Sequence, residues 1–203
     1  MYDAVVAGGS ISGLLAAREI AKNGHSVLVL EEGFEVGSPE HCGGLVSKNA
    51  LKELGIEPSQ KTFDSEIECA KIFSPEGKEI SINSKKQQIV VINRRELDKQ
   101  ASRQARDNGA KISVKTSFLE KNSNGVKTSN GDIECKFFID CRGVSRLVNK
   151  DRDGILLTAQ YEVYADWIKE GQVEVYFDLE KISRIFCMDN SFRKRSRQGR
   201  SFR

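Results

Sequence analysis

The sequence predicts an α/β fold in which short buried strands alternate with helices. Tyr2 to Ala7 is a continuous run of mostly small apolar residues, typical of a strand buried on both faces of a parallel sheet. A glycine-rich turn follows. Apolar residues then recur at helical spacing from Ser12 to Asn23, and Gly24 stands where a helix C-cap is expected. Ser26 to Leu30 indicates a second buried strand, so these segments together predict a β-α-β unit.

Composition indicates a globular protein of one or two domains. The 203 residues are 38% hydrophobic and 30% charged. They contain neither an apolar run of about 18 residues that could span a bilayer nor the layout of a secretion signal, so we expect a cytoplasmic location. The five cysteines are odd in number and form no C-x-x-C pair, which fits neither a disulfide framework nor a zinc site. We expect reduced thiols and no metal site.

The turn after the first strand matches a nucleotide-binding pattern. Residues 8–13 are Gly-Gly-Ser-Ile-Ser-Gly, which is G-x-G-x-x-G with serine in place of the second glycine. The turn links a strand to a helix, and the acid Glu31 ends the second strand, as a dinucleotide-binding fold requires. Amide groups at the helix start would receive a pyrophosphate, and Glu31 would accept hydrogen bonds from ribose hydroxyls. A strand-turn-helix without a ligand is the alternative. The predicted contacts here are Gly8, Gly9, Ser10, Ser12, Gly13, Glu31 and Glu32.

The rest of the chain does not continue as a simple NAD dehydrogenase would. A loop at 32–44 and a short helix at 47–54 precede strand-like segments at 68–73, 79–82 and 88–92. A helix at 94–108 and a strand at 110–114 follow. Turns at 124–125 and 130–131 punctuate a β meander that ends at 137–139, and segments 155–163 and 173–177 are β-rich again. This layout predicts two interleaved parts.

Three further motifs carry a family resemblance. Residues 93–98, Asn-Arg-Arg-Glu-Leu-Asp, look like the R-x-x-(F/L)-D element of certain flavoproteins. Residues 139–146 look like their A-D-G-x-x-S-x-(V/L) element, with Cys141 and Arg142 interposed between Asp140 and Gly143. Residues 35–47 closely resemble a loop with a P-x-x-C-G element beside the flavin. Together these motifs make the chain resemble the geranylgeranyl reductase family of FAD-dependent oxidoreductases, in particular archaeal digeranylgeranylglycerophospholipid reductases.

The resemblance implies a fold and a cofactor. The fold is a Rossmann-like FAD-binding domain of the glutathione-reductase type, hydroxylase-like, interleaved with a β-rich substrate domain and truncated. Residues 1–150 would be the FAD-binding domain with a β insert at about 63–92, residues 151–181 the start of the substrate domain, and residues 182–203 a basic tail.

The resemblance also adds site residues. Cys42 would lie near the flavin ring as a catalytic candidate, whereas a cysteine in an ordinary turn-rich loop would be only a small apolar side chain. The adjacent His41 is not expected to act as an acid. Arg94 would lie near the FAD; a solvated charge at a helix start is the alternative for it and for Arg95. The additional predicted cofactor contacts are Cys42, Gly43, Gly44, Arg94 and Asp140.

The activity implied is the reduction of C=C bonds in isoprenoid lipid chains. Reduced FAD would deliver a hydride while the protein orients a prenyl chain in a dry apolar tunnel. The implied partners are a prenyl lipid substrate and an electron donor, with peripheral membrane contact and no nucleic acid. An FAD-dependent aromatic monooxygenase and a non-catalytic truncated nucleotide-binding module are the two alternatives.

The last 22 residues differ from the rest of the chain. Residues 182–203 contain seven basic residues and one acid, Asp189. Met188-Asp189 requires ATG GAY codons, and reading them one base later gives tryptophan. The shifted frame permits Tyr-Pro-Gly-Phe-Phe-Ala-Trp, an aromatic segment of the family's kind. We therefore hypothesise a one-base insertion near codon 181, with a basic arm for nucleic acid or membranes as the alternative. Without the family's second FAD element, we expect weak FAD binding or none, and an incomplete core.

Overall fold

The structure is a computed structural model that describes residues 1–39, 42–83, 89–143, 159–161, 169–177 and 186–190. The chain divides into two compact units, each assembled from two separate stretches of sequence. The first unit is Met1–His41 with Arg94–Ala159, and the second is Cys42–Asn93 with Gln160–Arg203. The predicted α/β class with an interleaved β-rich part is confirmed.

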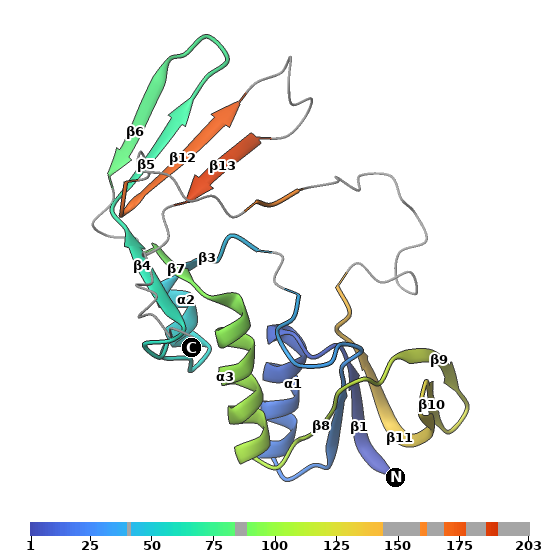
Figure 1. The fold of residues 1–203 in the computed structure, drawn as a ribbon. Helices are drawn as coiled ribbons and strands as arrows, with labels where there is room; N and C mark the ends of the chain where they lie inside the picture. Colours follow the sequence, from blue (N-terminus) through green and yellow to red (C-terminus); the bar gives the residue numbers. More distant parts are fainter. Residues whose placement is uncertain (40–41, 84–88, 144–158, 162–168, 178–185, 191–203) are drawn as a thin grey trace, which may run out of the picture. The chain divides into compact units, whose positions relative to one another are not determined.

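A six-stranded sheet forms the centre of the first unit. Its order is β8-β2-β1-β11-β10-β9 (Figure 1). β1 (Tyr2–Ala7) pairs in parallel with β2 (Val27–Leu30) and with β11 (Gly131–Asp140), and β2 pairs in parallel with β8 (Lys111–Ser113). The carboxyl ends of β1, β2 and β11 therefore lie along one edge, where ligands bind in open α/β sheets.

Two helices cover one face of this sheet. α1 (Ile11–Lys22) and α3 (Arg94–Asp107) lie side by side in Figure 1. Leu14 and Ala17 of α1 and Ala105 of α3 are fully buried, together with Val6 of β1. Removing such side chains from water is the main force that holds helix to sheet. The spacing of the buried residues Gly13, Leu14, Ala17 and Ala21 is the helical repeat predicted from the sequence.

An antiparallel meander extends the sheet beyond β11. β9 (Phe118–Asn122), β10 (Gly125–Thr128) and the first half of β11 pair through the predicted turns. Phe118 and Val126 from this meander pack in one apolar cluster with Val5 and Leu28, and Phe118 stacks on Phe138 with 4.5 Å between ring centroids. The sheet is therefore buried on both faces around β1 and β2, as their unbroken apolar sequences predicted.

The second unit consists of two small sheets and one short helix. β7 (Ile89–Ile92) lies between β3 (Leu45–Ser47) and β4 (Phe63–Ile67), both antiparallel to it. The other sheet has the order β13-β12-β5-β6, from β13 (Phe186–Asn190), β12 (Gln172–Phe177), β5 (Cys69–Phe73) and β6 (Glu79–Asn83). α2 (Lys48–Glu53) begins at Ser47, whose side chain accepts a hydrogen bond from the Ala50 amide.

Three strands of the second unit were not predicted as strands. β3 has three residues and β4 carries polar and apolar residues without clean alternation, so pairing with β7, rather than local pattern, makes them strands. β13 lies in the segment assigned to the basic tail and pairs with β12. The rest of that tail, and most of the predicted strand at 155–163, lie outside the described residues.

Candidate nucleotide-binding site

The turn between β1 and α1 is shaped by the close approach of another chain segment. Gly8 has φ +107°, and a Cβ placed on it would lie 2.5 Å from the Cys141 carbonyl oxygen. An L-residue rarely adopts this φ, and the contact would be a clash, so the position requires glycine. The Cys141 amide donates to the Ala7 carbonyl at 2.8 Å, which holds the chain after β11 against the turn.

Gly13 allows α1 to begin directly against this turn. A Cβ at Gly13 would lie 2.0 Å from the Gly8 carbonyl oxygen, so any larger residue would push the helix away. Ser10, in place of the motif's second glycine, has φ −88° and ψ 177°, an extended conformation open to any residue. The geometry thus explains why glycine is needed at positions 8 and 13 but not at position 10.

The amino terminus of α1 keeps its backbone donors available to a ligand. Ser10 is the N-cap residue, but its side chain makes no capping hydrogen bond, and the first turn contains no acidic residue. A helix start carries a partial positive charge and N–H groups without intrahelical partners. The turn therefore presents the features that receive phosphate groups in dinucleotide-binding folds.

Glu31 directly follows β2, beside the same turn. Its Oε2 accepts from the Gly9 amide at 2.9 Å, and its Oε1 accepts from the Gly33 amide at 2.7 Å. A Cβ at Gly9 would lie 2.7 Å from Glu31 Oε2, so this glycine makes room for the carboxylate. Two backbone amides thus fix the acid at the position where the motif places the ribose-binding carboxylate. Glu32, the next residue, is exposed.

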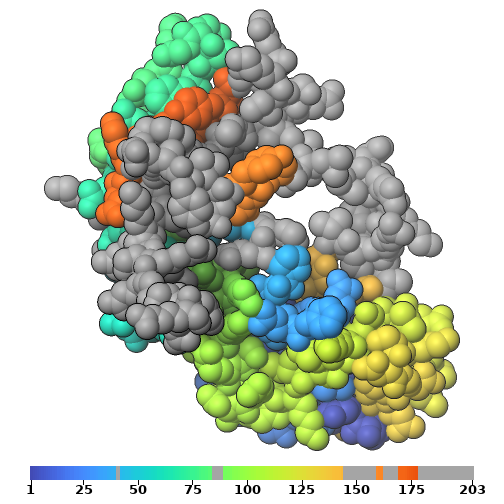
Figure 2. Space-filling model, in the orientation of Figure 1, coloured from blue at the N-terminus to red at the C-terminus, as the bar shows by residue number. Residues whose placement is uncertain are grey.

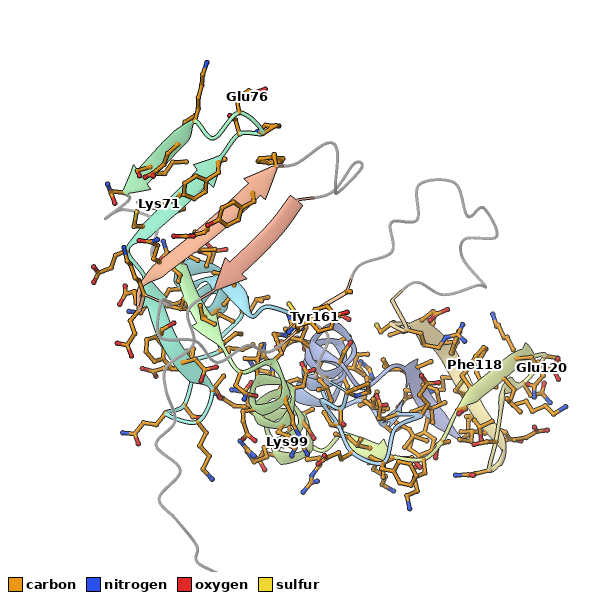
Figure 3. The ribbon with its side chains drawn as sticks, turned by 45° about the horizontal axis from the view of Figure 1, so that its top comes forward. Lys71, Glu76, Lys99, Phe118, Glu120 and Tyr161 are labelled. Atoms are coloured by element: carbon orange, nitrogen blue, oxygen red, sulfur yellow. The ribbon has the colours of Figure 1, made fainter. Side chains whose placement is uncertain are left out.

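The loop after β2 is held by hydrogen bonds and ion pairs from two neighbouring segments. The Lys115 amide donates to the Gly33 carbonyl at 2.9 Å. In Figure 2 this loop, in light blue, lies against the yellow-green segment that contains Lys115. Glu35 pairs with Arg95 and, at 2.9 Å, with Lys99, which points outward from α3 in Figure 3. The hydrogen bond from Lys99 and both positive charges lower the pKa of Glu35.

This ion pair distinguishes the two arginines at the start of α3. Arg95 is exposed and holds the loop through Glu35, whereas Arg94 is half-buried. The charge of Arg95 therefore stabilises the loop after β2, and this role does not require a ligand. Arg94 stays the predicted cofactor contact of the two.

Asp140 and Arg142 form a compact pair at the end of β11. Arg142 donates from Nε to Asp140 Oδ1 at 2.9 Å and from its terminal guanidinium nitrogen to Oδ2 at 2.8 Å, and its own amide also reaches Oδ1 at 3.2 Å. The guanidinium lies 4.6 Å from the centre of the Phe118 ring. The hydrogen bonds to Asp140 raise the pKa of Arg142, so its guanidinium stays positively charged. The sequence had shown Arg142 as an interposed residue, but its pairing was not predicted.

Cys141 lies between the members of this pair, beside the start of α1. Burial and the neighbouring Asp140 carboxylate raise the pKa of its thiol, while a hydrogen bond with the Ser12 side chain opposes that rise. Ser12 therefore already has a partner within the site. The thiol is in the neutral form at physiological pH.

The predicted flavin-side residues belong to the second unit. Cys42 is exposed, Gly43 is half-buried and Gly44 is buried. A Cβ at Gly44 would lie 2.2 Å from the Ile92 carbonyl oxygen, so packing against β7 alone requires a glycine here. His41 lies outside the described residues. The other predicted cofactor residues, Gly8 to Gly13, Glu31, Glu32, Arg94 and Asp140, belong to the first unit.

These residues fit the adenine side of a dinucleotide. The uncapped helix start offers amide donors to a pyrophosphate, the glycines leave space for its approach, and the fixed carboxylate of Glu31 can accept from a ribose. The fold and this candidate site are therefore typical of the dinucleotide-binding class of proteins.

Comparison with known proteins finds similar sequences in one family. The digeranylgeranylglycerophospholipid reductase of Methanocella arvoryzae is 33% identical over 135 residues, which are 65% of this chain and 33% of the relative. The enzyme of the same name from Methanococcus vannielii is 26% identical over 193 residues, 87% of this chain and 49% of the relative. No protein-family model matches the chain.

Solved structures agree with these relatives. A geranylgeranyl bacteriochlorophyll reductase-like protein from Thermoplasma acidophilum superposes with a TM-score of 0.70 at 26% identity, over 87% of this chain and 50% of that protein. A halogenase variant in complex with FAD has a TM-score of 0.54 at 17% identity, over 69% of this chain and 34% of that protein, which supports the fold alone.

Over the length that it shares with these proteins, the chain is similar to the geranylgeranyl reductase family, and the resemblance seen in its motifs is confirmed. The chain spans about a third to a half of the length of these curated relatives. Among the described residues, no helix is long and apolar enough to cross a membrane.

Proposed function

We propose that the chain is the nucleotide-binding part of an FAD-dependent oxidoreductase that reduces C=C bonds in isoprenoid lipid chains. The observation that carries the proposal is the glycine turn, with an uncapped helix start and an acid fixed by two backbone amides. The names of the relatives support a digeranylgeranylglycerophospholipid as the substrate class. A prenyl lipid and an electron donor are the proposed partners.

In this proposal the chain's own residues bind and orient the cofactor. The amides at the start of α1 hold the pyrophosphate, and Glu31 accepts from ribose hydroxyls with the lone pairs that the two backbone amides leave open. When bound, FAD would supply the hydride for reduction of the double bond. Arg94, Cys42, Gly43 and Gly44 are the proposed contacts nearer the flavin. The acid at Glu31 disfavours a cofactor with a 2′-phosphate on this ribose, because the charges would repel.

Nucleotide titration tests the proposal. Calorimetric titration of the purified chain with ADP should show one site, because ADP contains the ribose and diphosphate that the first unit is proposed to hold. If the chain does not bind ADP, the proposed site itself is wrong. FAD and NAD are compared on the frame-corrected protein, which should bind FAD in preference to NAD. Binding of NAD without binding of FAD would contradict the flavin assignment.

Two matched variants connect such binding to the turn. Glu31→Ala should weaken ADP binding by about tenfold or more, because two ribose hydrogen bonds to a carboxylate are lost. Glu120→Ala removes an exposed acid of the same unit, on β9 at the edge of the sheet (Figure 3), and should bind ADP like the unchanged chain. Equal loss in both variants would indicate a general charge effect rather than a ribose contact.

A further inference from the structure

Acidic groups gather at the sheet edge where a dinucleotide would bring more negative charge. Glu31 and Glu32 follow β2, and Asp140 ends β11. β1 lies between these strands, and the glycine turn follows it. A pyrophosphate carries two negative charges, so uncompensated carboxylates beside it would weaken binding. The edge therefore needs a cation close to these acids.

Arg142 meets this need. It holds both oxygens of Asp140, and Glu32 also stabilises its positive charge. Its backbone adjoins the turn, since a Cβ built on Gly8 would lie 3.1 Å from the Arg142 amide nitrogen. The Phe118 ring supports the guanidinium from β9. Backbone, ring and carboxylate thus fix the position of the charge.

We propose that Arg142 is a positioning residue for the dinucleotide diphosphate: it clamps and neutralises the Asp140 carboxylate so that the diphosphate can approach the start of α1. The inference rests on the proposed function and adds a residue to it. The family's motif joins the aspartate directly to a glycine, whereas here Cys141 and Arg142 intervene, so the clamp is a feature of this sequence.

The clamp makes a specific prediction about which ligands depend on it. Arg142→Met removes the charge but keeps a side chain long enough to cover the Phe118 ring. It should weaken ADP binding by about tenfold, the effect of one uncompensated charge near the surface, and leave adenosine binding unchanged. Arg142→Lys keeps the charge without the two-point contact and should fall between the unchanged chain and Arg142→Met.

A second change separates neutralisation from direct contact. If Arg142 acts by cancelling Asp140, then the double variant Asp140→Asn with Arg142→Met should regain most of the lost ADP affinity. A double variant as weak as Arg142→Met would overturn the proposal. Lys127→Met is the matched control, because it removes another cation paired with an acid, Glu120 at 3.1 Å, on the same meander.

Calorimetric titrations with ADP and adenosine, with thermal unfolding of each variant, decide the matter. Weaker ADP binding in Arg142→Met, with unchanged adenosine binding and rescue by Asp140→Asn, supports the clamp. Equal loss of both ligands would indicate a structural role and overturn it, as would unchanged ADP binding. If the chain without substitutions binds neither ADP nor adenosine, the proposed function is wrong and this inference fails with it. If that chain binds ADP and the Arg142→Met variant binds it equally well, only this inference is wrong.

Discussion

The cysteines of this chain differ in their surroundings, although the sequence gives each the same thiol. Cys42 is exposed in a loop. Cys141 is half-buried beside the start of α1, where burial and Asp140 raise its thiol pKa. Burial also raises the thiol pKa of Cys135 on β11. Because the thiolate is the reactive form, these surroundings set the order in which the thiols react.

Thiol labelling tests this order. In a brief treatment of the folded protein with iodoacetamide at neutral pH, Cys42 should be alkylated well before Cys135 and Cys141. Peptide mass spectrometry gives the rate at each position, and labelling in denaturant provides the reference in which the differences should disappear. Alkylation of Cys141 as fast as that of Cys42 would contradict the raised pKa and the burial.

Asp3 offers a test of electrostatics at one residue. Its carboxylate accepts from Lys136 Nζ at 2.6 Å and from the Ser26 hydroxyl and amide at 2.7 and 2.9 Å, which lowers its pKa below the ordinary 3.8. The Asp3 carboxylate is therefore protonated more readily in the unfolded state than in the folded state. The contribution of Asp3 to stability is fully present above pH 3.8 and declines as the pH falls below it.

Denaturant unfolding of Asp3→Asn tests this pH dependence. The variant should be less stable than the unchanged protein at neutral pH, and the difference should shrink as the pH falls below 3.8. Lys127→Met, which removes an exposed pair on the meander, controls for loss of a surface charge. A difference that stays constant across this range would show that the hydrogen bonds, rather than the charge, stabilise the fold.

At the scale of elements, the two ends of α1 need glycine for different reasons. At the start, Gly13 has no room for a side chain because the Gly8 carbonyl lies against it. At the end, Gly24 has φ +82° and donates to the Ala21 carbonyl at 2.9 Å, while His25 donates to Ile20, which closes the helix as a Schellman motif. One glycine is required for packing and the other for backbone conformation.

Alanine at each of these glycines should therefore have different effects. Gly24→Ala places an L-residue at positive φ with open space around it, so it should cost about 1 kcal/mol of stability and leave ADP binding unchanged. Gly13→Ala must shift the helix start and should cost about 2 kcal/mol or more, with loss of ADP binding. Chemical denaturation and calorimetry measure both effects. Equal stability losses, or ADP binding retained in Gly13→Ala, would contradict the role of the close contact.

Local pattern predicted most elements because most of them follow it. β1 and β2 are unbroken apolar runs, and α1 and α3 have buried residues at helical spacing, so the sequence alone located these elements. β3 and β4 become strands through distant pairing with β7, which no short window contains. In the candidate site, spacing predicted the glycines and Glu31, and their role as nucleotide contacts stays a prediction. The Asp140–Arg142 pair was not predicted, because such a pair depends on the backbone conformation after β11.

At the scale of the whole molecule, the chain combines a first unit with the fold of a dinucleotide-binding domain and a second, β-rich unit. The second unit shows apolar side chains at its surface: Ile80 is 63% exposed and Ile82 49% exposed, both on β6. Residues at i and i+2 of a strand share one face, so these two isoleucines lie on the same face of β6. The basic tail after residue 181 lacks the aromatic segment that the family resemblance implies at that point. The sequence of this tail agrees with the hypothesis that a single inserted base changed the reading frame near codon 181.

Resequencing the gene tests this hypothesis, and the corrected product tests the proposed activity. We expect a frame in which Lys181 is followed by Tyr-Pro-Gly-Phe-Phe-Ala-Trp and then by further flavoprotein sequence. The corrected protein should purify with yellow flavin absorbance, and with dithionite as reductant it should add two hydrogens per double bond to geranylgeranyl lipids, measured by mass spectrometry. Its Gly13→Ala variant should be colourless and inactive, because the clash with the Gly8 carbonyl displaces the helix start. An unbroken gene without flavoprotein sequence downstream would contradict the frameshift, whereas a yellow corrected protein that leaves the lipid unsaturated would contradict the substrate.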